Sequence, residues 1–465
     1  MFGRMVQKEL LNYLQDSRFV AVFALCVGLS VLSVFVGIQN YALEVREYHS
    51  VSETNQRALK AWLDEGNWEF TAKGYTWNRR PEVLSPLVYG LSGKLGQEVS
   101  IQVLKLPEFE GSFFETDPVH ALFNVLDLGF TVKAILSLFV LLFTYDAVCG
   151  EKEAGTLRLY ASFPVSRPML ALAKLVGALL AVTVPFVVAF LLVCSVLALS
   201  PDLELNADSW VRVAALMGIF VLYLGVFAAF GLWASALTHR RMVAFLGLLG
   251  LWTVWLFVVP NLAVRAAQGF APDKSIYEMD KELSALRWDT VKGRQKEMTA
   301  YWDQLEDVNW DSLTTAQQQG YLDGYRKIAE KWDDMYVPRL GQFQTDRRNQ
   351  MRKQHRLAQL FSMISPVGSM SYVSMDLCRT GFVQQERVED ALNAHMTYLT
   401  PYIRKKESTL GDRPTLTDFS PFVYRDIETV ETCLSRNIFP VLNLILLGVV
   451  GFAGAYVAML RYDVR

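Results

Sequence analysis

Six long apolar stretches dominate the pattern of hydrophobic and polar residues along the chain. Each is long enough to cross about 30 Å of hydrocarbon, which takes roughly 20 residues of helix. They cover residues 19–42, 125–145, 170–199, 210–237, 242–263 and 438–460. The pattern therefore predicts a mainly α-helical, polytopic membrane protein with six transmembrane helices.

Basic residues in the short connections predict how these spans are oriented, because Lys and Arg near span ends are retained in the cytoplasm. Such residues precede the first span, lie between the second and third and between the fourth and fifth, and close the chain. The opposite short connection, residues 200–208, holds only acidic charges. We therefore expect both termini, including a tail at residues 461–465, on the cytoplasmic side of a bacterial or archaeal cytoplasmic membrane.

This orientation places two large polar segments outside the cytoplasm. The first, residues 43–124, has little helical periodicity, and the alternation at residues 99–104 predicts a small mixed α/β region. The second, residues 264–437, is predicted to be a helical bundle because apolar residues recur at spacings of three and four. Pro338 and Pro366 predict breaks between its helices.

Two groups of residues in the second outer segment have alternative interpretations. The tryptophans are predicted to be core residues rather than a ligand cage; they are Trp288, Trp302, Trp310 and Trp332. Cys378 and Cys433 are expected outside the membrane, where an oxidising compartment would let them form a disulfide. The sequence does not show whether their Cα atoms come close enough, so this bond stays open.

Composition and charge exclude several classes of function. The chain of 465 residues is 52% hydrophobic, more than a soluble core requires, and its net charge of −2 argues against nucleic-acid binding. The five cysteines form no CxxC pair and the five histidines are far apart, so no metal site is expected. No catalytic motif and no GxxxxGK[ST] phosphate loop occurs, so we expect a protein that is not itself an enzyme and binds no cofactor.

The connection between the second and third spans, residues 146–169, is compact and charged, and has Gly and Pro at its turns. Such a segment has a defined shape, as docking onto another protein requires. The simpler interpretation is a solvated loop whose basic residues only fix the topology, and the residues alone leave both interpretations open. The candidate coupling residues are Asp146, Glu151, Glu153, Gly155, Thr156, Leu157, Arg158, Pro164 and Arg167.

The run GEKEAGTLRLYASFPVSR at residues 150–167, followed by Lys174 and Gly177, resembles the loop of type-2 ATP-binding-cassette exporter permeases. Residues 1–18 resemble the amphipathic elbow helix with which these permeases begin. The candidate residues of this elbow are Lys8, Glu9 and Arg18. Large outer segments after the first and fifth spans make the chain most similar to a subgroup that carries them.

The resemblance implies a permease dimer, either of two identical chains or of two related ones, that works with two copies of a separate cytoplasmic ATPase. ATP and Mg would bind to that ATPase, and the loop at residues 146–169 would couple its movement to export. The substrate stays open among lipid, peptide, hydrophobic toxin and polysaccharide precursor. The remaining expected contacts are membrane lipid and an envelope or periplasmic protein.

Three of the polar residues inside predicted spans are candidates for intramembrane contacts, at positions where a central charge costs about 2.5–3.5 kcal/mol on insertion scales. Lys133 is near the outer end of its span, so anchoring is favoured over transport. Asn261 and Asn443 could hydrogen bond across helices.

Two alternatives to export remain. A mechanotransmitter would use ATP hydrolysis to drive the outer segments against an envelope partner without moving a substrate. A membrane scaffold without ATP coupling is disfavoured by the charged loop.

Overall fold

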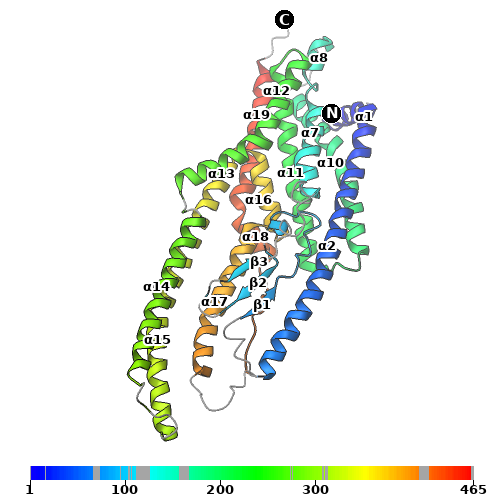
Figure 1. Cartoon of the computed structure of the whole chain (residues 1–465). Helices are drawn as coiled ribbons and strands as arrows, with labels where there is room; N and C mark the ends of the chain where they lie inside the picture. The colour runs from blue at the N-terminus through cyan, green and yellow to red at the C-terminus, as the bar shows by residue number, and fades with distance from the viewer. Residues whose placement is uncertain are drawn as a thin grey trace.

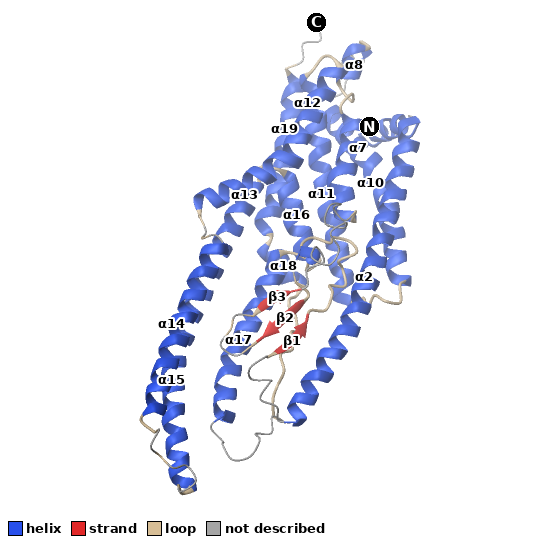
Figure 2. Cartoon of the chain, viewed as in Figure 1, coloured by secondary structure: helices blue, strands red, loops and turns tan. Residues whose placement is uncertain are grey.

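The computed structural model describes residues 2–15, 17–65, 74–94, 96–102, 105, 107–110, 126–156, 167–272, 274, 276–305, 308, 313–407 and 418–461. Most of these residues are helical (Figure 2). Helices long and apolar enough to span a membrane cover, within this part of the chain, Phe19–Asp64, Leu128–Glu153, Pro168–Leu199, Ala207–Leu237, Arg241–Phe270 and Ile438–Leu460. The predicted mainly α-helical, six-span membrane fold is therefore confirmed.

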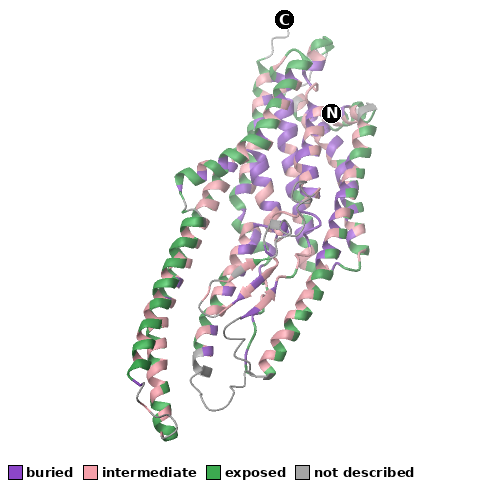
Figure 3. Cartoon of the chain, in the orientation of Figure 1, coloured by how far each residue is buried: buried purple, intermediate pink, exposed green. Residues whose placement is uncertain are grey.

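The membrane bundle is built around its fourth span, α11. Its elements are α2 (Ser17–Glu65), α6 (Leu128–Phe130), η2 (Thr131–Leu136), α7 (Ser137–Thr144), α10 (Arg167–Leu199), α11 (Ala207–Leu237), α12 (Arg241–Thr253), η3 (Val254–Val258), α13 (Val259–Phe270) and α19 (Ile438–Leu460). α11 is apolar around most of its circumference and packs against α7, α10, α12 and α19. Buried residues accordingly concentrate along it (Figure 3).

Small residues let the central helices approach closely. A Cβ added at Gly231 of α11 would lie 1.9 Å from Thr144 Oγ1, and one added at Gly451 of α19 would lie 3.0 Å from the Cβ of Ala229. Helix association in lipid relies on such close contacts, because lipid tails offer no hydrophobic driving force between helices. The glycines therefore set the spacing of α7, α11 and α19.

Two spans contain a π-helical segment, η2 in the second and η3 in the fifth. A π segment disturbs the regular hydrogen-bond ladder of the helix and leaves carbonyls in need of other donors. Tyr223 Oη donates to Lys133 O at 2.8 Å, and Ser365 Oγ donates to Trp255 O at 3.0 Å. Hydroxyl groups from neighbouring elements thus stabilise both segments.

The first and last described residues lie at one end of the bundle, and most of the two polar segments lies at the other (Figure 1). We call the described parts of residues 43–124 and 264–437 the distal region. Its elements are β1 (Tyr75–Asn78), η1 (Ser92–Lys94), β2 (Glu98–Ile101), β3 (Glu108–Glu110), α14 (Ile276–Asp303), α15 (Thr315–Ser362), α16 (Pro366–Leu377), α17 (Phe382–Glu407) and α18 (Val430–Arg436). The remaining helices, at the end with the termini, are α1 (Phe2–Gln15) and α8 (Cys149–Glu153).

The small sheet of the distal region is antiparallel with strand order β1-β2-β3, so β1 and β3 are its edges. Tyr75, Val99 and Ile101 point to one face and pack with Val388 and Leu392 of α17 in a separate hydrophobic cluster. The other face of β1 contacts the distal half of α2, which runs past the apolar stretch to Glu65. This arrangement agrees with the predicted mixed α/β region.

The second distal segment is helical but does not form one bundle. α14 and α15 form a long hairpin (Figure 1), which Arg352 of α15 joins to Glu386 and Asp390 of α17 at 3.2 and 2.8 Å. Pro338 lies inside α15, so the predicted break at that residue is wrong, whereas Pro366 does begin α16. Trp288 and Trp302 have exposed fractions of 62% and 38%, so the prediction that they are core residues is also wrong.

Candidate functional site

The candidate site is the short helix α8 at the end of the bundle that carries the termini (Figure 1). The helix ends because Gly155 adopts a left-handed conformation, with φ of 70°, which glycine tolerates best. The N–H of Gly155 donates to Lys152 O at 3.2 Å across this turn. The surface then presents the exposed residues 153–156 to solvent.

Glu151 of α8 points back into the bundle and pairs with a buried lysine. Lys174 of α10, whose side chain is 1% exposed, donates to Glu151 Oε1 at 2.7 Å. The same ammonium lies 3.5 Å from both carboxylate oxygens of Glu9 on α1. Burying a charge without a partner is costly, so each of these groups requires the others. We call Glu9, Glu151 and Lys174 the buried triad.

The N-terminal helix can reach the buried triad because α10 has a glycine one turn beyond the lysine. A Cβ added at Gly177 would lie 2.7 Å from the Cβ of Glu9. Glycine therefore permits the close contact of α1 with α10. The ring of Tyr13 packs edge-on to that of Phe143, with 5.9 Å between the centroids, and this contact attaches α1 to the second span as well. Tyr13 is buried there, and burial raises the pKa of its hydroxyl.

The other two charges of α8 are bound to the fourth and fifth spans. Lys152 Nζ donates to Thr238 O at 3.1 Å and to Ala236 O, where a cation suits the partial negative charge of the C-terminus of α11. Glu153 accepts the backbone N–H of Arg241 at 2.8 Å and lies 3.2 Å from its guanidinium.

The start of α8 is bound to α11 as well. The hydroxyl of Ser235 accepts the N–H groups of Val148 and Cys149 at 2.9 and 3.1 Å. α8 is consequently bound to α10, α11 and α12, and Lys174 of α10 links it indirectly to α1, so a displacement of α8 acts on all four. The described contacts of α8 are ion pairs and hydrogen bonds that can transmit a movement of α8 to the neighbouring helices.

The structure assigns the predicted coupling residues to different environments. Glu151 and Glu153 are bound within the chain, whereas Gly155 and Thr156 are exposed. Asp146 is half-buried, directly before α8. Leu157, Arg158 and Pro164 lie outside the described residues, and of Arg167 only the backbone is described, at the start of α10.

The structure describes the predicted elbow residues to different extents. Lys8 lies 3.3 Å from Glu9 and is 39% exposed, and of Arg18 only the helical backbone is described. The sequence predictions missed Lys174 as the centre of the triad. The signal was a single lysine in an otherwise apolar helix, one turn before Gly177.

The polar residues predicted inside spans make local and long-range contacts. Lys133 lies over the ring of Phe130, 5.8 Å from its centroid. Asn261 donates to Phe257 O of its own turn at 2.7 Å. Asn443 reaches across to the α16 segment and donates to Met363 O at 2.7 Å and to Ser369 Oγ at 2.9 Å.

Cys378 and Cys433 carry free thiols in the structure, and both are buried with exposed fractions of 1% and 0%. Burial alone would protect them from alkylating reagents, whether bonded or not. The disulfide therefore stays a prediction, to be tested by mass spectrometry of denatured, unreduced protein.

A second group of charges attaches the distal region to the spans. Arg212 of α11 is 1% exposed; it donates to Asp208 at 2.8 Å, to Glu428 O at 2.8 Å and to Leu377 O at 3.3 Å. The carboxylate of Glu428 in turn pairs with Arg436 at 2.8 Å. A guanidinium offers five donors in a planar fork, which suits a residue that joins three separate segments.

A multi-pass bundle whose α8 segment connects an amphipathic N-terminal helix to the spans is the architecture of a transporter membrane subunit. Residues 4–464 match the family described as ABC-2 family transporter protein, and the chain belongs to this family. A relative from Pseudomonas aeruginosa, "Probable ABC transporter permease protein NosY", is 32% identical over 151 residues, which are 30% of this chain and 52% of that protein. The chain thus matches about half the length of this relative.

Proposed function

We propose that this chain is the permease subunit of an ATP-binding-cassette exporter that works with two copies of a separate cytoplasmic ATPase. The observation that carries the proposal is the attachment of α8 to four membrane elements through Glu151, Lys152 and Glu153. A second permease chain, identical or related, would complete the transporter. ATP and Mg would be bound by the ATPase.

In this proposal the exposed tip at residues 153–156 receives the push of the ATPase. Glu151 passes it to Lys174 of α10, and Lys174 passes it on to Glu9 of α1. The contacts of Lys152 and Glu153 pass it to α11 and α12. Closely packed helices change between discrete arrangements rather than deforming continuously, so the expected result is a rigid shift of the bundle.

The proposed orientation has the termini and α8 in the cytoplasm and the distal region outside. Basic residues near α8 support this orientation, since Lys152 and Arg241 flank the short connections there. The acidic connection of residues 200–206 lies at the opposite end of the bundle, beside the distal region.

One observation favours mechanotransmission as a second candidate function. Arg212 joins α11 directly to the backbone of the distal region at Leu377 and Glu428. A movement of α11 would therefore displace the distal region even if no substrate crossed the membrane.

The test is purification of the chain in mild detergent from its host, with mass spectrometry of bound proteins and an ATP hydrolysis assay. Thr156→Arg alters the exposed tip and leaves the side chains of the buried triad in place, since the Thr156 hydroxyl contacts only the main-chain carbonyl of Glu151, at 3.4 Å. It should therefore abolish binding of the ATPase at an unchanged yield of folded chain. Thr345→Arg is the matched control, because Thr345 is an exposed helical threonine in the distal region. Purification without any ATPase, or equal effects of both variants, would contradict the proposal.

A further inference from the structure

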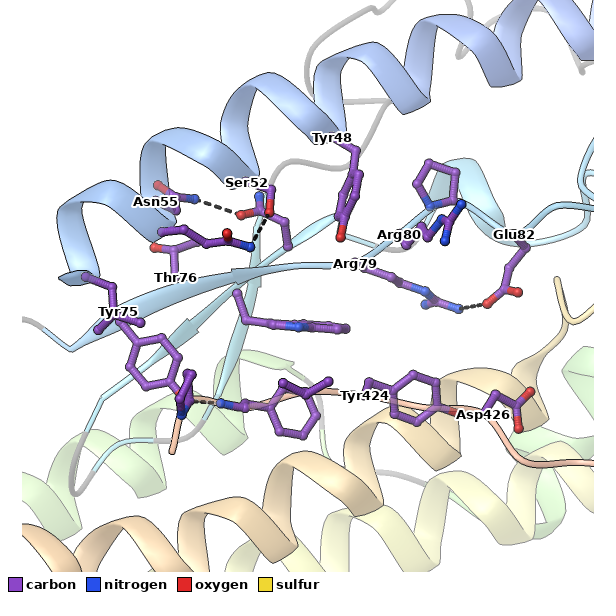
Figure 4. Close-up of a pocket in the computed structure, with 18 of the residues that line it drawn as sticks. Tyr48, Ser52, Asn55, Tyr75, Thr76, Arg79, Arg80, Glu82, Tyr424 and Asp426 are labelled. Carbon is purple, nitrogen blue, oxygen red and sulfur yellow. Dashed lines mark hydrogen bonds and ion pairs between the residues drawn. The ribbon is translucent and has the colours of Figure 1, made fainter. Parts of the chain in front are cut away.

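The distal region contains a cavity of about 680 Å³ at the edge of the small sheet. The distal half of α2 forms one wall, residues 421–426 form the other, and β1 lies between them (Figure 4). Ligand pockets in proteins range over about 300–1,000 Å³, so the cavity can hold a ligand. We call it the edge slot.

The main chain of β1 presents the hydrogen-bonding groups of Thr76 and Asn78 to the edge slot. β1 pairs with β2 in antiparallel register, and the N–H of Arg79 donates to Gln97 O at 2.8 Å at the end of this pairing. Alternate residues of an antiparallel strand point their N–H and C=O groups to opposite sides. Those of Thr76 and Asn78 therefore point away from β2, toward the side on which the sheet has no further described strand.

Both faces of this edge are held in place by side chains. The rings of Trp77 and Phe422 pack edge to face, with centroids 5.0 Å apart, on one side of the strand. Asn55 of α2 donates to Asn78 Oδ1 at 2.9 Å on the other side. The edge is thus rigid before any ligand binds, which lowers the entropy cost of binding.

The charges around the edge slot are unequal. The charged residues of its lining are Lys60, Arg79, Arg80 and Arg379, with Glu82 and Asp426 as the acids. Arg79, Arg80 and Arg379 pair within the chain with Glu82, Glu204 and Asp426, at 3.9, 2.8 and 3.0 Å. Lys60 has no ion pair among the described residues, so it is the cation that favours a ligand with negative charge. Tyr48, Trp77 and Tyr424 add aromatic surface, on which an extended chain can lay its side chains.

We propose that the edge slot binds an extended, acidic peptide segment of another protein, which adds to the sheet as a strand beside β1. A row of main-chain donors and acceptors at a strand edge is complementary to another peptide backbone. Strands pair at about 4.8 Å, so the added strand would lie in the plane of the sheet, between α2 and residues 421–426. This inference does not depend on the ATPase or on export.

The first test selects peptides from a phage-displayed library of octapeptides on the purified full-length chain. Labelled synthetic copies of the enriched peptides then give the dissociation constant. We expect acidic sequences, and we expect Thr76→Pro to weaken binding by about tenfold or more, because it removes an N–H that points into the slot. Thr76→Val keeps that N–H and should bind within about twofold of the wild type.

A second measurement leaves the protein unchanged, in case Thr76→Pro disturbs folding. N-methylation of single amides along the peptide should weaken binding at every second position, because only alternate amides of an added strand face β1. Lys60→Glu should shift the selected sequences away from acidic residues. No enrichment, enrichment insensitive to Thr76→Pro and to N-methylation, or selection of basic peptides would each overturn the proposal.

Discussion

Replacement of Lys174 by methionine removes the cation of the buried triad and keeps most of its volume. Glu9 and Glu151 would then lie in the bundle with side-chain exposures of only 8% and 19% and without the ammonium. At 2.7 Å and an effective dielectric constant of about 20, the attraction between Lys174 and Glu151 is about 6 kcal/mol before desolvation. Breaking buried pairs by removing one partner costs about 3–5 kcal/mol, and we expect Lys174→Met to destabilise the chain by this amount.

A double-mutant cycle separates the ion pair from other effects of the substitution. Glu151→Gln alone leaves Lys174 paired with Glu9, whereas Glu151→Gln in the Lys174→Met background removes a carboxylate that has lost its partner. The double variant should therefore be more stable than the sum of the two single effects predicts, by on the order of 2 kcal/mol. Equilibrium unfolding in mixed micelles gives these free energies, and ATP hydrolysis by the purified transporter gives the functional effect.

Lys8→Met is the matched control, because Lys8 also lies near Glu9, at 3.3 Å, but is 39% exposed. Exposed ion pairs contribute about 0–1 kcal/mol, so this variant should unfold almost as the wild type does. Additive effects of Lys174→Met and Glu151→Gln, within about 0.5 kcal/mol, would refute the triad. An effect of Lys8→Met equal to that of Lys174→Met would refute its dependence on burial.

Four further substitutions, at Gly177, Gly218, Arg212 and Glu82, test other parts of the structure by the same unfolding measurement. Gly177→Ala should destabilise by about 1–3 kcal/mol, because the new Cβ would lie 2.7 Å from the Cβ of Glu9. Gly218→Ala, with nothing within 4 Å, should instead stabilise its helix by up to about 1 kcal/mol. Arg212→Met should cost about 1–3 kcal/mol by removing the side-chain donor to Leu377 O, since Arg379 still donates to Asp208 at 3.4 Å and to Glu428 O at 2.9 Å. Burial raises the pKa of Glu82 to about 7, so the native state binds its proton more tightly than the unfolded state does, and stability should fall as pH rises from 5 to 8. Glu82→Gln should flatten that slope; an identical slope in both would contradict the assignment.

The membrane fold could be predicted because hydrocarbon thickness imposes a length on each apolar run. The ends of the helices could not. The first apolar run ends near residue 42, but α2 continues to Glu65. Hydropathy marks where a helix leaves lipid, whereas the polar continuation of α2 depends on its contacts with β1. The first span predicted from the sequence is therefore shorter than α2.

In the distal region, periodicity predicted helices but not their partners. Trp288 lies on a helix of a two-helix hairpin, which has one buried seam and leaves its other faces open. An apolar stripe cannot by itself reveal whether a second layer covers it, so Trp288 was wrongly predicted to be core. Pro338 illustrates the converse, because α15 continues through a residue that usually disfavours helix.

For the candidate site, the sequence indicated the segment but not the partners of its charges. Glu151 is a predicted coupling residue, and its carboxylate pairs with Lys174 inside the chain. The triad joins three segments that are distant in sequence, so only the tertiary structure brings them together. Reversing the charge of Glu151 therefore perturbs the attachment of α1 and α10, and Thr156 is the better position at which to test docking.

The two candidate functions share one mechanical element, because α11 is bound at both of its ends. Ser235, near one end, holds the start of α8, and Arg212, near the other end, holds the distal region. α11 has 31 residues and is therefore about 46 Å long, so even a small tilt of a rigid helix displaces its far end by several ångströms. A push on α8 thus reaches the distal region whether or not a substrate moves. The path from α8 through α11 to the distal region is the same for export and for mechanotransmission. The two functions therefore differ in the neighbours of the spans and in the occupant of the edge slot.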